Sequence, residues 1–522
     1  MIFTTLKFLV FFVAVFLGYY IVPRKLQWLV LLVASTYFYL CASVKYVIFV
    51  LMASLITYIG ALILDKLEIK QSTYLKNNKE NLSKETKKLY KAKQEKKKKI
   101  VITLTVLGTL SMLLIMKYTG FVFENISAIA NVFHFHFTSP AWNLILPLGI
   151  SFYTFMSIGY AIDVYRGEYP AEKNFLKYFL FVSYFPHILQ GPMDKYNELS
   201  KDLFEGKKFD YNQAVQGIYR IVIGVLKKML VADKLAPIVG TVTTNLDQYF
   251  GINIFLAILF YAIQLYADFS GYMDIAIGCS KMLGIRIAEN FNAPYFSKSI
   301  AEYWRRWHIS LGAWFRDYVY YPILRGNFAS KIRKHWKDKN KYLSNNLPTV
   351  FALAILWILI GFWHGSTWGY ILYGMYHGGI IILSTLLAPV YDKFYEKFPR
   401  LVKTKIYGAF QIIRTFCLVL GGYFLFCIGD LKPAIQMFTN MFKNNFDGVK
   451  ILTNVTQDSS VSIFIGTIVL IILDILTIHK IDIYEKLRKV PFFLRWPIYC
   501  LGMFTVIMLA SGTVQEFLYF QF

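Results

Sequence analysis

The chain of 522 residues is 56% hydrophobic and 18% aromatic, and only 17% of its residues carry charge. Soluble domains are roughly 45–50% apolar and about 25% charged, so this composition excludes a soluble enzyme, a disordered protein and a fibrous protein. The 56 Lys and Arg residues against 31 Asp and Glu give a net charge of +25. The excess of positive charge lies mainly in loops between apolar runs. This distribution is typical of membrane proteins that follow the positive-inside rule, rather than of nucleic-acid-binding proteins.

Apolar runs recur along the whole chain and predict an all-α, polytopic membrane protein with about 11–12 transmembrane helices. The first run, residues 2–22, precedes no small-residue cleavage site, and we expect a retained helix rather than a signal peptide. Residues 65–99 hold 13 lysines and 5 acidic residues. This basic arm predicts a cytoplasmic segment after three crossings, with the N-terminus outside.

Loop charges further along predict that the chain end also lies outside. Residues 175–189 and 291–323 are apolar but interrupted by Pro, His, Arg and Asp, which predicts re-entrant or embedded amphipathic helices. We expect a single membrane domain over residues 1–522, with residues 145–380 as its core and residues 496–522 as a final helix and outer tail.

Neither a disulfide framework nor a metal site is indicated. The five cysteines are widely separated and form no C-x-x-C pair: Cys41, Cys279, Cys417, Cys427 and Cys500. No H-E-x-x-H occurs and no His or Cys group has zinc spacing, which disfavours a metalloprotease. The absence of G-x-S-x-G disfavours a serine hydrolase.

Histidine is the candidate chemical group, because its imidazole is suited to proton transfer near neutral pH. Four histidines lie in or beside apolar segments, where an ionisable side chain predicts a functional role: His187, His308, His364 and His377. The other four lie in an aromatic loop or in basic loops, and we expect no direct role for them: His134, His136, His335 and His479.

Polar residues concentrate between positions 264 and 318. On a continuous helix, Trp304, Trp307 and His308 would share one face, at spacings of three and four residues. Arg305 and Arg306 would then point away from that face. They are predicted either to position donor phosphates or to take a structural role, such as pairing with Glu302.

Several motifs occur here in a fixed order. They are D-F-S-G-Y-x-D from Asp268, E-N-F-N-A-P-Y from Glu289, W-R-R-W-H-I-S-L from Trp304 and W-F-R-D-Y from Trp314. F-P-H-x-x-x-G-P at 185–192, W-H-G at 363–365 and the terminal F-L-Y-F-Q-F at 517–522 flank them. This set closely resembles the membrane-bound O-acyltransferase family, and specifically its bacterial branch that contains the alginate O-acetyltransferase membrane subunit.

The resemblance implies an O-acyltransferase of the bacterial cytoplasmic membrane, and specifically an O-acetyltransferase. It implies that His364 is the catalytic histidine and that His308 is a second active-site histidine beside a channel. The acyl group would come from a cytoplasmic thioester such as acetyl-CoA, with no bound cofactor. It would pass to an extracytoplasmic polysaccharide or peptidoglycan through a secreted SGNH-type partner, similar to the AlgX or DltD proteins.

By the same resemblance, Tyr519 either carries the acyl group onward or belongs to a tail that docks a partner or packs. We also predict substrate or donor contacts for a further group of residues: Arg305, Arg306, Trp307, His187, Gln190, Asp268 and His377. For Asp268 and Asp274, a role as scaffold hydrogen-bonding groups is favoured over a catalytic role.

Two alternative functions stay open at this point. A D-alanyl transferase for teichoic acid belongs to the same class of enzyme, but the corresponding tyrosine motif would be expected on a separate small peptide. A transporter for polysaccharide or lipid-linked sugar would also be polytopic and basic. It would be expected to show repeated halves with matching broken helices, and no such repeat is visible.

Overall fold

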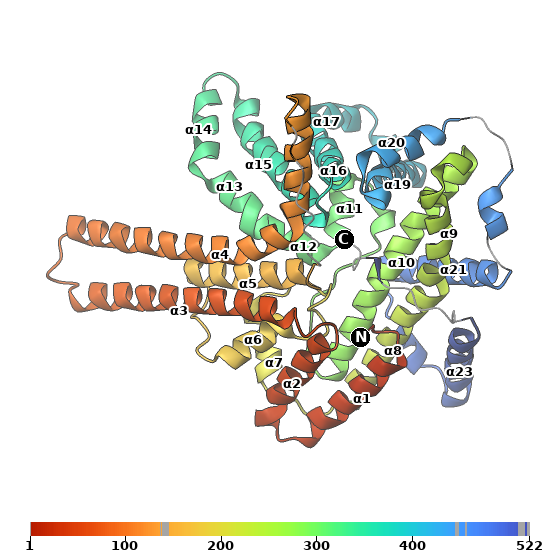
Figure 1. Cartoon of the computed structure of the whole chain (residues 1–522), viewed down its shortest axis with the longest axis horizontal. Coiled ribbons are helices and arrows are strands. Elements are labelled where there is room, and N and C mark those ends of the chain that lie inside the picture. Colours follow the sequence, from red (N-terminus) through yellow and green to blue (C-terminus); the bar gives the residue numbers. More distant parts are fainter. Residues whose placement is uncertain are drawn as a thin grey trace. The chain divides into compact units, whose positions relative to one another are not determined.

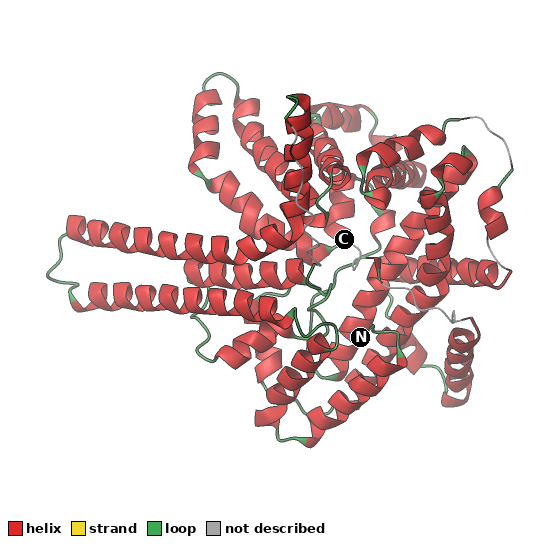
Figure 2. Cartoon of the chain, in the orientation of Figure 1, coloured by secondary structure: helices red, strands yellow, loops and turns green. Residues whose placement is uncertain are grey.

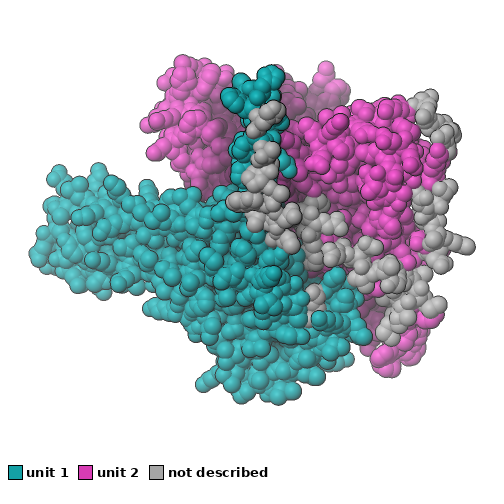
Figure 3. Space-filling view, in the orientation of Figure 1, with its two compact units in different colours: residues 1–217, 279–288 teal, residues 218–278, 289–522 magenta. Residues whose placement is uncertain are grey.

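A computed structural model describes residues 2–135, 137, 146–443, 448–454, 457–509 and 517–518. Its regular elements are helices (Figure 2), which confirms the all-α class. The chain forms two compact units, coloured separately in Figure 3. The first contains residues 1–217 and 279–288, and the second contains residues 218–278 and 289–522.

In the described residues of the first unit, the helices up to the start of α8 are (Figure 1): α1 Leu6–Ile21, α2 Gln27–Leu40, α3 Val47–Asn77, α4 Lys84–Val132, α5 Ile150–Arg166, α6 Phe175–Ser183, α7 Tyr196–Phe204 and α8 Tyr211–Leu226. The second unit is built on the remaining helices: α9 Asp233–Thr244, α10 Ile252–Met282, α11 Ile300–Arg306, α12 Ile309–Phe315, α13 Tyr321–Arg325, α14 Asn327–Trp336, α15 Lys341–His364, α16 Trp368–Leu386, α17 Ala388–Lys397, α18 Pro399–Val402, α19 Lys405–Ile428, α20 Leu431–Asn440, α21 Gln457–Ile478, α22 Ile483–Arg488 and α23 Phe492–Leu509.

The chain is a multi-pass membrane protein. Six of the described helices are long and apolar enough to cross a membrane: α3, α4, α10, α15, α19 and residues 459–478 of α21. Helices α16 and α17 add a seventh span if the pair, bent by 58°, is counted as one. This number is below the expected 11–12 because other apolar runs form helices too short for a full span, such as the 16-residue α1.

The predicted basic arm, residues 65–99, is mostly helical. It comprises the end of α3 and the start of α4, which lie side by side in a long hairpin (Figure 1). Ser83 caps α4, since its hydroxyl accepts a hydrogen bond from the Thr86 amide, and Glu85 complements the positive end of the helix dipole. Tyr74 stacks on Tyr90 with ring centroids 4.1 Å apart, which joins the two helices within the arm.

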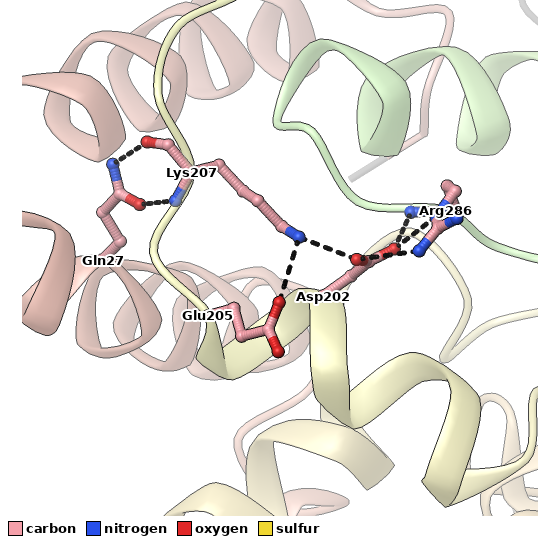
Figure 4. Close-up of polar contacts among 5 residues, drawn as sticks. All are labelled: Gln27, Asp202, Glu205, Lys207 and Arg286. Carbon is pink, nitrogen blue, oxygen red and sulfur yellow. Dashed lines mark hydrogen bonds and ion pairs between the residues drawn. The ribbon is translucent and has the colours of Figure 1, made fainter.

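A polar cluster in the first unit explains why residues 279–288 belong to it (Figure 4). Arg286 donates to both oxygens of Asp202, from Nε at 2.9 Å and from Nη2 at 3.3 Å. The Lys207 ammonium lies 2.8 Å from the same carboxylate. Gln27 then joins α2 to this loop, because its side-chain amide exchanges two hydrogen bonds with the backbone of Lys207, at 2.7 and 3.1 Å.

This cluster predicts a pH-dependent stability. Burial acts to raise the pKa of Asp202, but hydrogen bonds from Arg286 and Lys207 outweigh it and hold the pKa below its usual value. The stabilisation is therefore complete above the unfolded pKa of about 3.9 and is lost as pH falls through the lower folded pKa. We expect Asp202→Asn to lower the unfolding temperature in detergent near neutral pH, and the difference from wild type to shrink below about pH 4.

The exposed Asp392 on α17 offers the control, because Asp392→Asn removes a carboxylate outside this cluster. Equal unfolding temperatures for wild type and Asp202→Asn near neutral pH would contradict the stabilising role of the cluster.

Candidate active site

The segment that carries His308 is not a continuous helix. Helix α11 ends at Arg306, Trp307 is extended with φ −103° and ψ 128°, and α12 begins at Ile309. His308 at the junction adopts the left-handed conformation, with φ 47° and ψ 53°. The expectation that Trp304, Trp307 and His308 share one helical face is therefore wrong.

The cause of the break is pairing with the E-N-F-N segment. Phe291 and Trp307 form an antiparallel bridge, and the Asn292 amide donates to the Arg306 carbonyl at 3.0 Å. The fully buried Asn290 accepts the Ile309 amide on its carbonyl at 3.1 Å and the Ser310 amide on its side-chain oxygen at 2.8 Å. These bonds compensate a backbone conformation that costs on the order of 1–3 kcal/mol and is typical of functional sites.

The two histidines predicted to be catalytic lie close to one indole. The His308 ring is 5.6 Å from the Trp363 ring, and the Trp363 ring is 4.9 Å from that of His364, between ring centroids. His308 is 1% exposed and His364 is 3% exposed. The structure therefore brings the two imidazoles to within two ring contacts of each other, in a buried aromatic cluster.

Different elements of the second unit position these two rings. His364 is the last residue of α15, where its ring also contacts Phe426 of α19 at 5.0 Å. The ring of Phe269, on α10, contacts His308 edge-on at 4.8 Å. Burial lowers the pKa of His308, which lies outside the long apolar helices, to about 3. His308 is therefore neutral at physiological pH, with one ring nitrogen that donates a hydrogen bond and one that accepts.

His377 belongs to the same aromatic cluster. It lies fully buried on α16, and Tyr373, one turn earlier, contacts both His377 at 4.7 Å and His364 at 5.8 Å. Trp304 contacts His377 at 5.4 Å. The imidazole packs directly against Gly422 of α19. A larger residue would not fit there, because a Cβ on Gly422 would lie 2.6 Å from His377 Nε2.

The two adjacent arginines differ in their surroundings. Arg306 pairs with Glu302 one turn earlier, at 2.7 Å, which is the structural role considered for it. Arg305 is exposed, and its guanidinium stays a predicted donor contact. Trp307 is 2% exposed and stacks with Tyr303, so its indole is part of the packing around the break.

Asp268 lies in a buried ion-pair cluster. Lys228 Nζ contacts Asp268 Oδ1 at 2.6 Å and Asp233 Oδ1 at 2.8 Å. The second oxygen of Asp268 accepts the backbone amide of Leu518 at 2.8 Å. Asp274, two turns of α10 further along, pairs separately with Arg220 and with Lys227. Both aspartates thus make the scaffold contacts that the sequence suggested as one interpretation.

His187 and Gln190 lie in the first unit. The His187 ring bonds the Phe181 carbonyl at 3.0 Å through Nε2, and Nδ1 lies 3.8 Å from Asp194. Gly191 closes a tight turn on His187, since a Cβ at Gly191 would lie 2.1 Å from the His187 Cα. The motif F-P-H-x-x-x-G-P therefore builds a buried turn, and the substrate contacts of His187 and Gln190 stay a prediction.

Two predicted residues lie outside the part of the chain that the structure describes: Tyr519, the candidate acyl carrier, and His136. Among the described residues, no group of three His, Cys, Asp or Glu side chains is arranged to hold a metal ion.

Residues 164–428 match the sequence profile of the membrane-bound O-acyltransferase family. This chain belongs to that family. The match covers half of the chain and includes His187, His308, His364 and His377. The predicted family is thereby confirmed, and the protein is an O-acyltransferase.

The names of three curated relatives describe acyl transfer to alginate, to peptidoglycan and to teichoic acid. The probable alginate O-acetylase of Azotobacter vinelandii is 32% identical over 85% of this chain and 78% of its own. The peptidoglycan O-acetyltransferase of Helicobacter pylori is 28% identical over 84% of this chain and 80% of its own. The teichoic acid D-alanyltransferase of Bacillus subtilis is 30% identical, over 55% of this chain and 70% of its own.

Lys228 and Tyr373 were not identified from the sequence as candidate functional residues. Lys228 lies within the apolar run 218–230, so the rule that an ionisable residue in such a run has a task could have found it. Tyr373 lies one turn before His377 on an apolar helix, and a lone tyrosine in that position carries no signal of its own.

Proposed function

We propose that this acyltransferase moves an acetyl group from a cytoplasmic thioester, such as acetyl-CoA, to hydroxyl groups of an extracytoplasmic polysaccharide or peptidoglycan. The observation that carries the proposal is the pair of buried imidazoles, His308 and His364, which both contact the indole ring of Trp363. The names of the acetyltransferase relatives support acetyl as the group transferred.

The proposed reaction requires one proton acceptor and one hydrogen-bond donor. His364 removes the proton from an attacking hydroxyl, whose oxygen bonds the thioester carbonyl carbon. The carbonyl oxygen becomes negatively charged, and the N–H of neutral His308 donates a hydrogen bond to it. The carbon–sulfur bond then breaks, and His364 returns the proton to the leaving thiolate. General-base assistance of this kind contributes about 10²–10⁴-fold in rate.

The setting of this reaction is also part of the proposal. The basic arm lies on the cytoplasmic side and both termini lie outside the cytoplasmic membrane, as the loop charges predict. A polar donor cannot cross the bilayer, so an embedded site lets the donor and the acceptor approach from opposite faces. A secreted SGNH-type protein would take the acyl group from the enzyme and complete the transfer to the glycan.

D-alanyl transfer to teichoic acid is the second candidate. The 30% identity to the Bacillus subtilis enzyme favours it, although that match covers 55% of this chain. The donor used for labelling separates the two candidates.

A labelling experiment tests the proposal at Tyr519. We expect purified protein incubated with radiolabelled acetyl-CoA to form a base-labile ester on Tyr519, because a phenol can hold the acyl group between donor and partner. Tyr519→Phe removes that oxygen and should abolish both the label and transfer to the envelope polymer. Mass spectrometry of the terminal peptide identifies the labelled residue.

The exposed Tyr395 of α17 provides the matched control, since Tyr395→Phe makes the same change elsewhere. Normal polymer ester content in the Tyr519→Phe strain would overturn the carrier role. Labelling by a D-alanyl donor and not by acetyl-CoA would replace the acetyl assignment with the second candidate.

A further inference from the structure

A fully enclosed ion cluster lies beside the end of the chain in the second unit. Lys228 belongs to the π-helical segment Lys227–Ala232, an irregular turn that is frequent at functional sites. The Lys228 side chain is 1% exposed, and those of Asp233 and Asp268 are 1% and 2% exposed. One ammonium group thus faces two carboxylates away from solvent.

Such a cluster needs hydrogen-bond donors besides the lysine. Removing charged groups from water costs several kcal/mol per ion, and the cost is recovered only when their remaining lone pairs and protons are satisfied. Lys228 satisfies Asp268 Oδ1 at 2.6 Å. The donor for Asp268 Oδ2 is the backbone amide of Leu518, at 2.8 Å. The chain end therefore supplies part of what the cluster requires.

Phe517 makes the second set of contacts. Its side chain is fully buried, and Lys228 Nζ lies 4.3 Å from its ring centroid, within the range of a cation–π interaction. Tyr272, one turn after Asp268 on α10, meets the Phe517 ring edge-on at 5.0 Å. Charge, backbone and aromatic contacts thus converge on two consecutive residues, Phe517 and Leu518.

We propose that Lys228, Asp233 and Asp268 form a docking site for the C-terminal tail, and that these three are positioning residues for Tyr519. Docking of the tail stands on the contacts above, whereas its purpose rests on the carrier role proposed for Tyr519. Consecutive Cα atoms are about 3.8 Å apart, so fixing one residue restricts the positions that the next residue can take. A carrier that must meet an imidazole gains rate from such restriction.

This assignment changes the role predicted for Asp268. Each of its carboxylate oxygens is engaged, one with Lys228 and one with Leu518, so we assign it to the tail rather than to the acyl donor. Asp233 shares the Lys228 ammonium and fixes its place between the two carboxylates.

Accessibility of the tail provides the direct test. A single reporter is made as Phe522→Cys in the full-length protein with its native cysteines replaced by alanine, and its reaction with a maleimide is followed in detergent. Loss of a buried charge-assisted contact predicts that Lys228→Met raises the labelling rate about tenfold or more, whereas Lys228→Arg keeps it near that of the parent. Lys227→Met is the matched control, because Lys227 pairs with Asp274 instead.

Phe517→Ala provides a second route that leaves the ion cluster intact and should also free the tail. It keeps the proposal testable if Lys228→Met fails to fold, which size-exclusion chromatography detects. Parental labelling rates in Phe517→Ala and in every folded Lys228→Met sample would overturn the docking site.

Activity separates the docking site from the carrier role. If both proposals hold, Lys228→Met and Phe517→Ala lower kcat by about tenfold or more, leave the KM for the acyl donor unchanged, and Lys228→Arg restores kcat. Faster labelling with unchanged kcat would keep the docking site and reject the carrier role of Tyr519. Lower kcat with parental labelling would reject the docking site.

Discussion

His364→Ala is expected to abolish acyl transfer while the protein still inserts and folds. Removal of a general base lowers a rate by about 10²–10⁴-fold, and no other imidazole takes the same place at the end of α15. The effect should appear in kcat, because in the proposed reaction the His364 ring accepts a proton only during turnover. The measurement is the rate of acetyl incorporation from labelled acetyl-CoA, normalised to the amount of folded enzyme in proteoliposomes.

Two further variants make this result specific. His364→Gln keeps a polar side chain of similar reach without a basic nitrogen, and it should be as inactive as the alanine variant without leaving a void against Phe426. His335→Ala removes an exposed imidazole on the basic helix α14 and should retain wild-type activity. A wild-type rate in His364→Gln would reject His364 as the proton acceptor.

Gly374→Ala is expected to destabilise the protein and to reduce its activity, because α15 and α16 meet backbone to backbone at this position. A Cβ on Gly374 would lie 2.3 Å from the Trp357 carbonyl oxygen and 2.8 Å from the Gly361 amide nitrogen. The helices would have to separate, and overpacking of this kind costs about 1–3 kcal/mol. Since α15 ends at His364 and α16 carries His377, the separation also displaces both imidazoles.

Gly379, on the same helix, provides an unusually close control. A Cβ there would meet nothing within 4 Å, so Gly379→Ala should be neutral, or stabilising by up to about 1 kcal/mol through helix propensity. Thermal unfolding in detergent and the acetylation rate are measured for both variants. Equal unfolding temperatures for Gly374→Ala and Gly379→Ala would contradict the close packing of α15 against α16.

The features that could be predicted from the sequence are those with a local pattern. Long apolar runs gave the helices and the membrane class, because a span must satisfy its backbone internally. The dense lysines of residues 65–99 identified the basic arm, and the order of the short motifs identified the family. The pairing of α3 and α4 into a hairpin could not be predicted in this way, because it depends on contacts between two separate helices.

The site itself depends on contacts distant in sequence, and here local reasoning failed. Nothing within residues 300–310 reveals that the helix breaks at His308. The cause is the buried Asn290, whose oxygens accept the amides that start α12. Lys228 stands out as an ionisable residue in an apolar run, but its contacts with Asp268 and Phe517 could not be predicted, because these residues lie 40 and 289 residues away along the chain. Apolar periodicity identifies faces of helices but does not reveal such partners.

Helix α10 has a consequence for the order in which the nascent chain can assemble. Its residues up to 278 belong to the second unit, while residues 279–288 complete the first. Ribosomes add about 5–20 residues per second, so Asp202 emerges several seconds before Arg286, one of the two cations that pair with it. During that interval residues 1–217 lack the segment 279–288 that completes the first unit, and Asp202 can pair with Lys207 but not with Arg286. Biogenesis of the amino-terminal half therefore requires that synthesis has already entered the second.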